Sequence, residues 1–191
     1  MELIHELRQE TEQAHRALEK DLVGKIKAVH SRADYENLLR MMYGFYAAME
    51  KHMQPFLSDK PGLDFAHRRK ADWLVRDIET VGSSAALSCC DVLPPINSAS
   101  SALGAMYVLE GSTLGGQIIA KMLKQQLRVE GNSGLSFFLS YGTETTTMWE
   151  RFKAELSKPF NALEQSEIIR TAKDTFIKFR TWIEQYDANK L

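Results

Sequence analysis

The residues best suited to chemistry are His15 and two neighbours at helical spacing. Arg8 lies seven residues earlier, on nearly the same helical face and about 10 Å away at 1.5 Å per residue. Glu19 lies four residues later, where its carboxylate can accept a hydrogen bond from the imidazole. A histidine that ligates a metal usually needs such an acceptor to fix its tautomer and orientation. Taken alone, the spacing favours an ordinary exposed His–Glu pair, so a metal site needs support from a second element.

That support comes from glycines within a helical pattern that runs from about residue 99 to 129. The segment holds Gly104, Gly111, Gly115 and Gly116, and each glycine inside a helix costs about 1 kcal/mol relative to alanine. Gly104, Gly111 and Gly115 fall on one helical face. The helix either packs closely on another helix, kinks there, or lies across a planar cofactor. With His15 opposite, the third possibility predicts a two-sided site for heme, whose iron takes a proximal histidine.

The elements that must position these residues are helices, because the apolar periodicity is helical almost throughout. We predict an all-α fold, a compact bundle of six to eight helices forming a single domain over residues 1–191. Expected helices cover residues 2–23 (ended by Gly24), about 31–55 (begun by a Ser31–Asp34 capping box and closed by Pro55), about 64–81, 99–129, 147–156 (capped by Thr147 with Glu150) and about 167–185. Loops are expected at 83–98 and 131–144.

Composition excludes several classes of protein. Lys and Arg total 24 against 25 Asp and Glu, a net charge of -1 that argues against a nucleic-acid binder with a basic surface. No apolar run is long enough to cross a bilayer, and the first residues lack a signal-peptide pattern. Cys89 and Cys90 are adjacent and cannot join distant segments, which indicates a reducing compartment. We therefore expect a cytoplasmic protein without a membrane segment, and the small net charge fits a monomer.

Several motifs together resemble the heme oxygenase family. LEGSTLGGQ (Leu109 to Gln117) resembles the distal-helix signature, and LRQETEQAHRALE (Leu7 to Glu19) resembles the proximal helix around the iron-ligating histidine. The similarity extends over roughly residues 5–185 and includes Tyr43, Gly44, Phe45, Tyr46, Glu50, Phe137, Phe138, Ala172, Lys173 and Phe176. The pattern is closest to the bacterial, biliverdin-producing branch, which lacks the C-terminal membrane anchor of animal relatives.

The resemblance implies an enzyme that binds heme and cleaves it with O2 and external electrons to biliverdin, CO and ferrous iron. It implies that His15 is the iron ligand and Glu19 its orienting partner. Gly111 and Gly115 would let the distal helix bend over the heme, and Tyr46 would join a distal hydrogen-bond network. Heme propionates would meet Arg8 and Lys153, with Arg151, Lys178 and Arg180 as alternatives. Phe176, with Phe179, would wall the pocket.

One departure from the family concerns Ser112. Animal members carry an aspartate at this position, where it organises water beside the bound oxygen. A serine hydroxyl can hold water but carries no charge. We therefore expect the proton-delivery network to recruit backbone carbonyls or another side chain.

The electrons must come from another protein, because no flavin or pyridine-nucleotide fingerprint occurs. The basic run His67-Arg68-Arg69-Lys70 could dock an acidic ferredoxin or reductase, although a solvated helix start is the more common meaning of such a run.

Two other functions compete with heme cleavage. Glu12 and His15 form a Glu-x-x-His pair typical of di-iron bundles, but no second copy occurs. A protein that binds or traffics heme without cleaving it is the other alternative.

Overall fold

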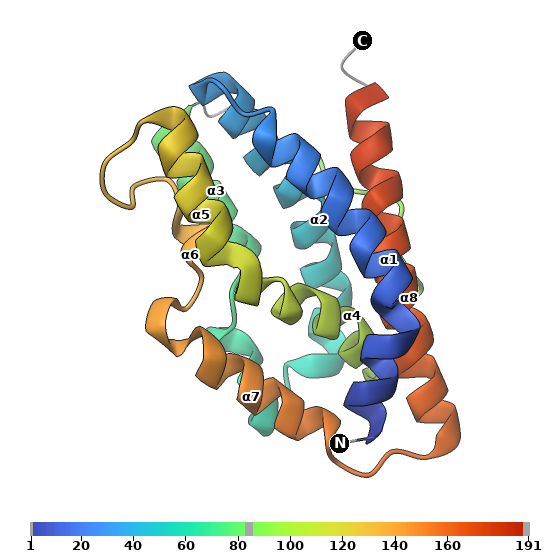
Figure 1. Ribbon diagram of the computed structural model, residues 1–191. Helices are drawn as coiled ribbons and strands as arrows, with labels where there is room; N and C mark the ends of the chain where they lie inside the picture. The colour runs from blue at the N-terminus through green and yellow to red at the C-terminus, as the bar shows by residue number, and fades with distance from the viewer. Residues whose placement is uncertain (1, 83–85, 189–191) are drawn as a thin grey trace.

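The computed structural model describes residues 2–82 and 86–188, and in these ranges the chain is helical and contains no strand. This confirms the all-α prediction. Figure 1 shows the bundle, with α1 and α8 side by side. The α-helices are α1 (Glu2–Lys27), α2 (Arg32–Leu57), α3 (Ala71–Val81), α4 (Ala99–Gly111), α5 (Thr113–Leu127), α6 (Ser136–Leu139), α7 (Thr145–Leu156) and α8 (Ala162–Ala188), joined by the short 3₁₀ helices η1 (Pro61–Leu63), η2 (Phe65–His67) and η3 (Gly142–Glu144).

The start of α2 is as predicted, but the expected ends of the first two helices are wrong. The Asp34 amide donates to Ser31 Oγ over 3.1 Å, and the Ser31 amide donates to Asp34 Oδ2 over 2.9 Å, which completes the capping box. Helix α1 continues past Gly24 because its last turn packs against the core through Ile26, which is only 3% exposed. Pro55 lies inside the last turn of α2, which continues to the buried Leu57.

Three later helix starts also differ from the prediction. Helix α3 begins at Ala71 rather than near residue 64, because Asp64 has a left-handed backbone (φ 50°) that an α-helix cannot contain. Helix α7 begins at Thr145 rather than Thr147. Helix α8 begins at Ala162 because Asn161 caps it: Glu164 N donates to Asn161 Oδ1 (3.0 Å) and Asn161 N to Glu164 Oε2 (2.8 Å).

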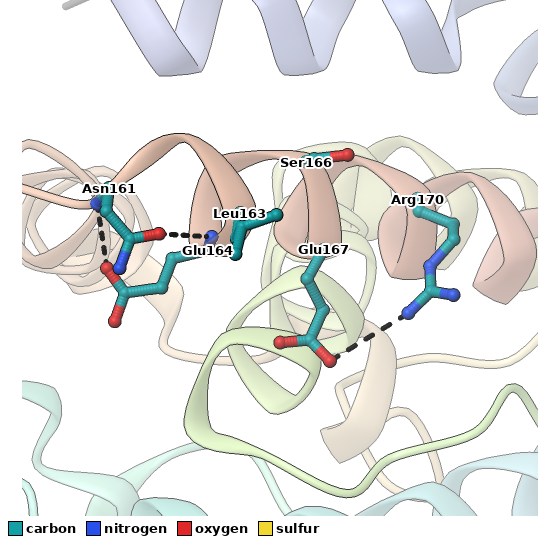
Figure 2. A pocket seen from close by; sticks show the side chains of 6 residues that line it. All are labelled: Asn161, Leu163, Glu164, Ser166, Glu167 and Arg170. Carbon is teal, nitrogen blue, oxygen red and sulfur yellow. Dashed lines mark hydrogen bonds and ion pairs between the residues drawn. The ribbon is translucent and has the colours of Figure 1, made fainter.

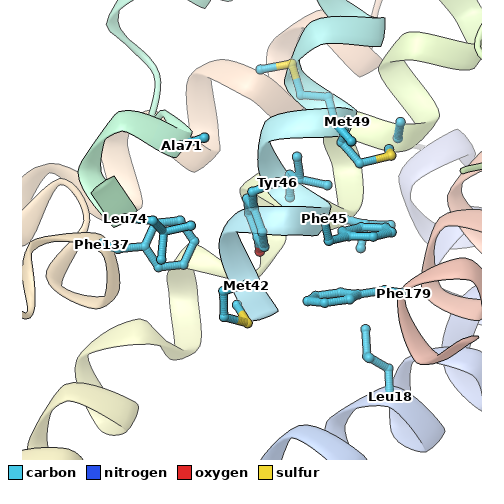
Figure 3. Close-up of a cluster of buried hydrophobic side chains, with 14 of the residues drawn as sticks. Leu18, Met42, Phe45, Tyr46, Met49, Ala71, Leu74, Phe137 and Phe179 are labelled. Carbon is cyan, nitrogen blue, oxygen red and sulfur yellow. The ribbon is translucent and has the colours of Figure 1, made fainter. Parts of the chain in front are cut away.

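Aromatic side chains join the helices that flank the centre of the bundle (Figure 3). Phe45 of α2 stacks on Phe179 of α8 with ring centroids 4.2 Å apart, and Tyr46 meets Phe137 of α6 edge-on at 4.9 Å. Phe179 is therefore part of the core, and its role in the wall of a heme pocket stays a prediction. These contacts fix the Tyr46 hydroxyl against the helices beside it.

Two of the four glycines in the segment 99–129 serve helix packing. A Cβ at Gly104 would lie well inside 3.0 Å of the Ile168 carbonyl on α8, and a Cβ at Gly116 would overlap the Phe138 carbonyl. The backbones approach too closely for a side chain at either position. Close packing thus explains Gly104 and Gly116, and Gly104 does not share the surroundings of Gly111 and Gly115.

Within residues 2–82 and 86–188, no helix combines the length and the apolar character that crossing a bilayer requires.

Candidate functional site

The predicted helix over 99–129 is broken at Ser112. Helix α4 ends at Gly111 and α5 begins at Thr113. At the break, Ser112 Oγ donates to the Leu109 carbonyl over 2.7 Å, and Thr113 Oγ1 donates to the Glu110 carbonyl over 2.7 Å. Side-chain hydroxyls that bond to the preceding turn compete with the regular helix hydrogen bonds. The local sequence therefore builds the kink that was one of the three explanations for the glycines.

Neither of the two glycines beside this break is needed for close helix packing. A Cβ at Gly115 would meet no atom within 4 Å, and one at Gly111 would meet only the Trp149 ring, at 3.8 Å or more. On the same helix, Leu114 and Ile118 are 49% and 68% exposed. The chain thus presents a stretch of bare helix backbone with apolar neighbours, a surface suited to a flat apolar group.

His15 lies on α1, which meets α5 near the C-terminal ends of the two helices. There, Gln126 Nε2 donates to the Ile26 carbonyl over 3.1 Å, and in Figure 1 the two helices diverge from that point towards the break at Ser112. The imidazole is exposed and stacks on Phe176 of α8 with ring centroids 5.0 Å apart. Among the described residues, no hydrogen bond joins His15 to Glu19, which is also exposed. The orienting role of Glu19 therefore stays a prediction.

The structure brings Tyr46 and Ser112 together with a residue that the sequence analysis did not assign to the site. Tyr46 Oη lies 2.9 Å from Ser112 Oγ, and Arg69 Nη2 lies 2.6 Å from the same hydroxyl. Arg69 also donates to the Leu109 carbonyl over 2.7 Å. Its guanidinium carbon lies 4.3 Å from the ring centroid of Phe137. The hydroxyl at the break is therefore bonded to a backbone carbonyl and a cation.

Arg69 belongs to the basic run 67–70, which is not the solvated helix start that such runs commonly form. Arg68 is 2% exposed and pairs with the buried carboxylate of Glu110 over 2.6 Å. Lys70 lies 3.4 Å from Glu50 Oε1 and 3.4 Å from the centroid of the Phe65 ring, and burial lowers its pKa. His67 is the exposed member of the run. The run is therefore not a solvated helix start, and the burial of Arg68 and Lys70 gives no support to its use as a docking patch for an electron donor.

The buried pair Arg68–Glu110 predicts a large effect on stability. Arg68→Met is expected to lower the free energy of unfolding by about 3–5 kcal/mol, because Glu110 would be left buried without its cation. Urea unfolding of the ligand-free protein measures this loss. Arg170→Met is the matched control, since the Arg170 side chain is 61% exposed and its ion pair to Glu167 spans 3.8 Å. Equal losses in the two variants would contradict the prediction.

The cations predicted to bind carboxylates divide into two groups. Arg8 is exposed on α1, and its charge opposes the rise in the pKa of Tyr107 that burial causes. Lys153 is half-buried on α7 and pairs with Glu150 over 2.7 Å, and Arg151 beside it is exposed. Arg180 likewise pairs with Asp21 over 2.7 Å, and the charge of Lys178 opposes the rise in the pKa of Cys90 that burial causes. Lys153 and Arg180 are thus both paired, whereas Arg8 and Arg151 are the exposed cations of the set.

Surface hollows also occur away from the open helix face, on α8 and along α1. One lies on the first turns of α8 and is lined by polar residues such as Glu167 and Arg170 (Figure 2). It contains no predicted site residue. The other follows α1 and includes Glu19. Among the described residues, no group of three or more His, Cys, Asp or Glu is arranged to hold a metal, so Glu12 lacks the companions that a di-iron site requires.

The sequence and the fold are similar to those of known heme oxygenases. Residues 1–185 match the family model described as heme oxygenase. A heme oxygenase from Xanthomonas campestris pv. campestris is 30% identical over 154 residues, which cover 80% of this chain and 90% of that protein.

Solved structures of three proteins share the fold. The heme oxygenase from Neisseria meningitidis, in its NO- and CO-bound forms, has a TM-score of 0.79 at 18% identity, covering 97% of this chain and 92% of that one. Heme oxygenase from Leptospira interrogans gives 0.77 at 19% identity, covering 97% and 100%. Heme oxygenase-1 from the cyanobacterium Synechocystis, in complex with heme, gives 0.74 at 19% identity, covering 99% and 94%. With its family match extending over nearly the whole chain, the protein belongs to the heme oxygenase family, the enzymes that degrade heme to biliverdin.

Proposed function

We propose that this protein cleaves heme to biliverdin, CO and ferrous iron, with the substrate seated between α1 and the break of α4 and α5. The observation that carries this proposal is the contrast between adjacent glycines. Gly115 faces open space, whereas Gly116 is packed against backbone. Gly116 is explained by helix packing, but Gly115 has no structural reason to be glycine. A planar substrate that contacts the helix backbone supplies the reason.

In this arrangement, His15 binds the iron and Glu19 orients its imidazole by accepting a hydrogen bond from the other ring nitrogen. Phe176 already packs on the imidazole and continues as the wall of the site. Arg8 and Lys153, with Arg151, provide cations for the two propionates. His15 would thus hold the substrate through its iron, and these cations would hold it through its propionates.

On the distal side, the Tyr46 hydroxyl, which Ser112 Oγ fixes by a hydrogen bond of 2.9 Å, would hold the water from which a proton is delivered. The heme iron supplies oxygen binding and activation once it is reduced. Ser112 is suited to this position because it lies at the break, where the helix backbone leaves its regular path. Gly111 and Gly115 keep side chains away from the same face.

We infer that a separate ferredoxin or reductase supplies the electrons and that the enzyme acts as a cytoplasmic monomer. The absence of a flavin or nucleotide fingerprint in the sequence supports an external donor. Cys89 and Cys90 are both free thiols, which agrees with a reducing compartment. The inward-facing run 67–70 is not proposed as the docking surface.

The test is an absorption time course of the protein with one equivalent of hemin, followed in air after addition of ascorbate or a ferredoxin system. We expect a Soret band that forms and then decays while the broad red absorption of biliverdin grows. A stable Soret band would instead indicate a protein that binds heme without cleaving it. No Soret band would overturn the assignment of the site.

A further inference from the structure

We propose that Arg69 is a positioning residue that fixes the Ser112 hydroxyl and keeps a positive charge on the distal side, and that Tyr141 and the buried Arg68–Glu110 pair hold it there. This inference rests on the proposed function, because it concerns the same distal site. It assigns to a cation the task for which animal relatives use an aspartate.

The hydrogen bonds around Ser112 have a fixed direction. Its single hydroxyl proton is donated to the Leu109 carbonyl, 2.7 Å away. Ser112 Oγ can then only accept from Arg69 Nη2, at 2.6 Å, and from Tyr46 Oη, at 2.9 Å. Arg69 also donates to the Leu109 carbonyl. The guanidinium therefore determines where the Ser112 hydroxyl points. Arg69 Nη2 also donates to Tyr46 Oη over 3.4 Å, and the phenol oxygen keeps one lone pair for a further hydrogen bond.

The charge of Arg69 is not neutralised by an ion pair among the described residues. Its guanidinium lies over two aromatic rings, 4.3 Å from the centroid of Phe137 and 5.1 Å from that of Tyr46. The charged groups around it pair with one another: Glu110 with Arg68, Glu50 with Lys70, and Asp64 with His67. The positive charge thus remains available to the distal site.

A buried chain of hydrogen bonds connects the backbone of Arg69 to the same helix turn. The Arg69 amide donates to Tyr141 Oη over 2.6 Å, and Tyr141 donates to Glu110 Oε1 over 3.0 Å. Burial and the charge of Glu110 raise the pKa of Tyr141, so the phenol stays protonated as a donor. The other oxygen of Glu110 is held by Arg68.

Arg68 is itself anchored to backbone on two other elements. Its Nε donates to the Leu63 carbonyl over 2.8 Å and its Nη1 to the Met148 carbonyl over 2.9 Å. The two arginines thus bind the same turn at the end of α4. Arg68 binds the Glu110 side chain, and Arg69 binds the Leu109 carbonyl and the Ser112 hydroxyl. Tyr141 and Glu110 act on the site through Arg69, because they determine where its backbone lies.

The test is the acid–alkaline transition of the ferric heme complex, followed through its Soret and visible bands. A nearby cation favours deprotonation of the group that binds the iron on the distal side. Arg69→Ala is therefore expected to raise the midpoint pH of the transition, which corresponds to an acid dissociation constant about tenfold or more smaller. Arg69→Lys keeps the charge, so its midpoint pH is expected to stay much closer to that of the wild-type protein. Tyr141→Phe is expected to move the midpoint in the same direction by a smaller factor.

Tyr35→Phe is the matched control for Tyr141→Phe. The Tyr35 hydroxyl is also buried, and it donates to the Gly134 carbonyl over 2.6 Å, outside the distal cluster. Its loss is expected to lower the unfolding temperature without moving the transition. If Tyr141→Phe moves the midpoint no more than Tyr35→Phe, the positioning chain is refuted. An unchanged midpoint in Arg69→Ala refutes the role of Arg69.

These outcomes separate the inference from the proposed function. A wild-type complex that forms a Soret band but does not release biliverdin overturns the proposed cleavage. The acid–alkaline transition of that complex still tests the role of Arg69. A wild-type protein that binds no heme overturns both.

Discussion

Replacing His15 with alanine is expected to abolish heme turnover while leaving the fold intact. Losing a residue that only orients a metal ligand typically costs 10–100-fold, so losing the ligand itself is expected to cost more than about 100-fold. The exposed imidazole makes no hydrogen bond among the described residues, and its stacking on Phe176 is its main contact. Removing it should therefore change the unfolding free energy little. Single-turnover absorption with ascorbate measures the loss of activity.

The control variant and a rescue make this result specific. His5→Ala removes another exposed histidine from the same helix and is expected to leave turnover unchanged. Free imidazole added to His15→Ala can occupy the vacated space and is expected to restore the position of the Soret band and part of the activity. A His15→Ala protein that turns over at the wild-type rate would exclude His15 as the iron ligand and leave the open helix face without its proposed partner.

The sequence predicted those parts of the site that depend on local spacing. The family motifs assign His15, Phe176, Tyr46 and Ser112 to one site, and the structure places His15 beside Phe176 and Tyr46 beside Ser112. The break at Ser112 was one of three explanations for the glycines. Its cause, the bond from the Ser112 hydroxyl to the Leu109 carbonyl, is local and could have been anticipated.

The role of the run 67–70 could not be predicted in the same way. Four adjacent basic residues look solvated, but the partners that bury Arg68 and orient Arg69 lie far along the chain, at Glu110 and Ser112. Whether a charge is buried depends on a carboxylate or carbonyl that only the tertiary fold brings close. Spacing along one helix carries no information about such a contact.

Spacing along one helix likewise does not reveal the roles of the glycines. On one helical wheel, Gly104, Gly111 and Gly115 share a face, so periodicity assigned them one role. The break at Ser112 redirects the helix, and the neighbours then differ: the α8 backbone at Gly104, the Trp149 ring at Gly111 and open space at Gly115. Only the neighbouring helices reveal which glycine serves packing and which leaves room for a ligand.

Paired substitutions at Gly115 and Gly116 are expected to have opposite effects. Gly115→Leu should leave the unfolding free energy of the ligand-free protein unchanged or raise it by up to about 1 kcal/mol, because a helix gains from losing a glycine and nothing lies within 4 Å. In the heme complex, the new side chain should occupy substrate space. Overpacking typically costs about 1–3 kcal/mol, which corresponds to roughly 5- to 150-fold weaker heme binding.

Gly116→Ala should lower the free energy of unfolding of the ligand-free protein. Its Cβ would overlap the Phe138 carbonyl, so the backbone of one helix would have to shift. We expect a loss of about 1–3 kcal/mol or more on urea unfolding, of the kind that overpacking produces. Hemin titration of the folded variant should show a smaller loss of affinity than Gly115→Leu. The comparison separates a glycine kept for the fold from one kept for the substrate, since general damage to α5 would lower stability in both variants. Wild-type heme affinity in Gly115→Leu would mean that heme does not contact this face, and the structural reason for Gly115 would have to be sought elsewhere.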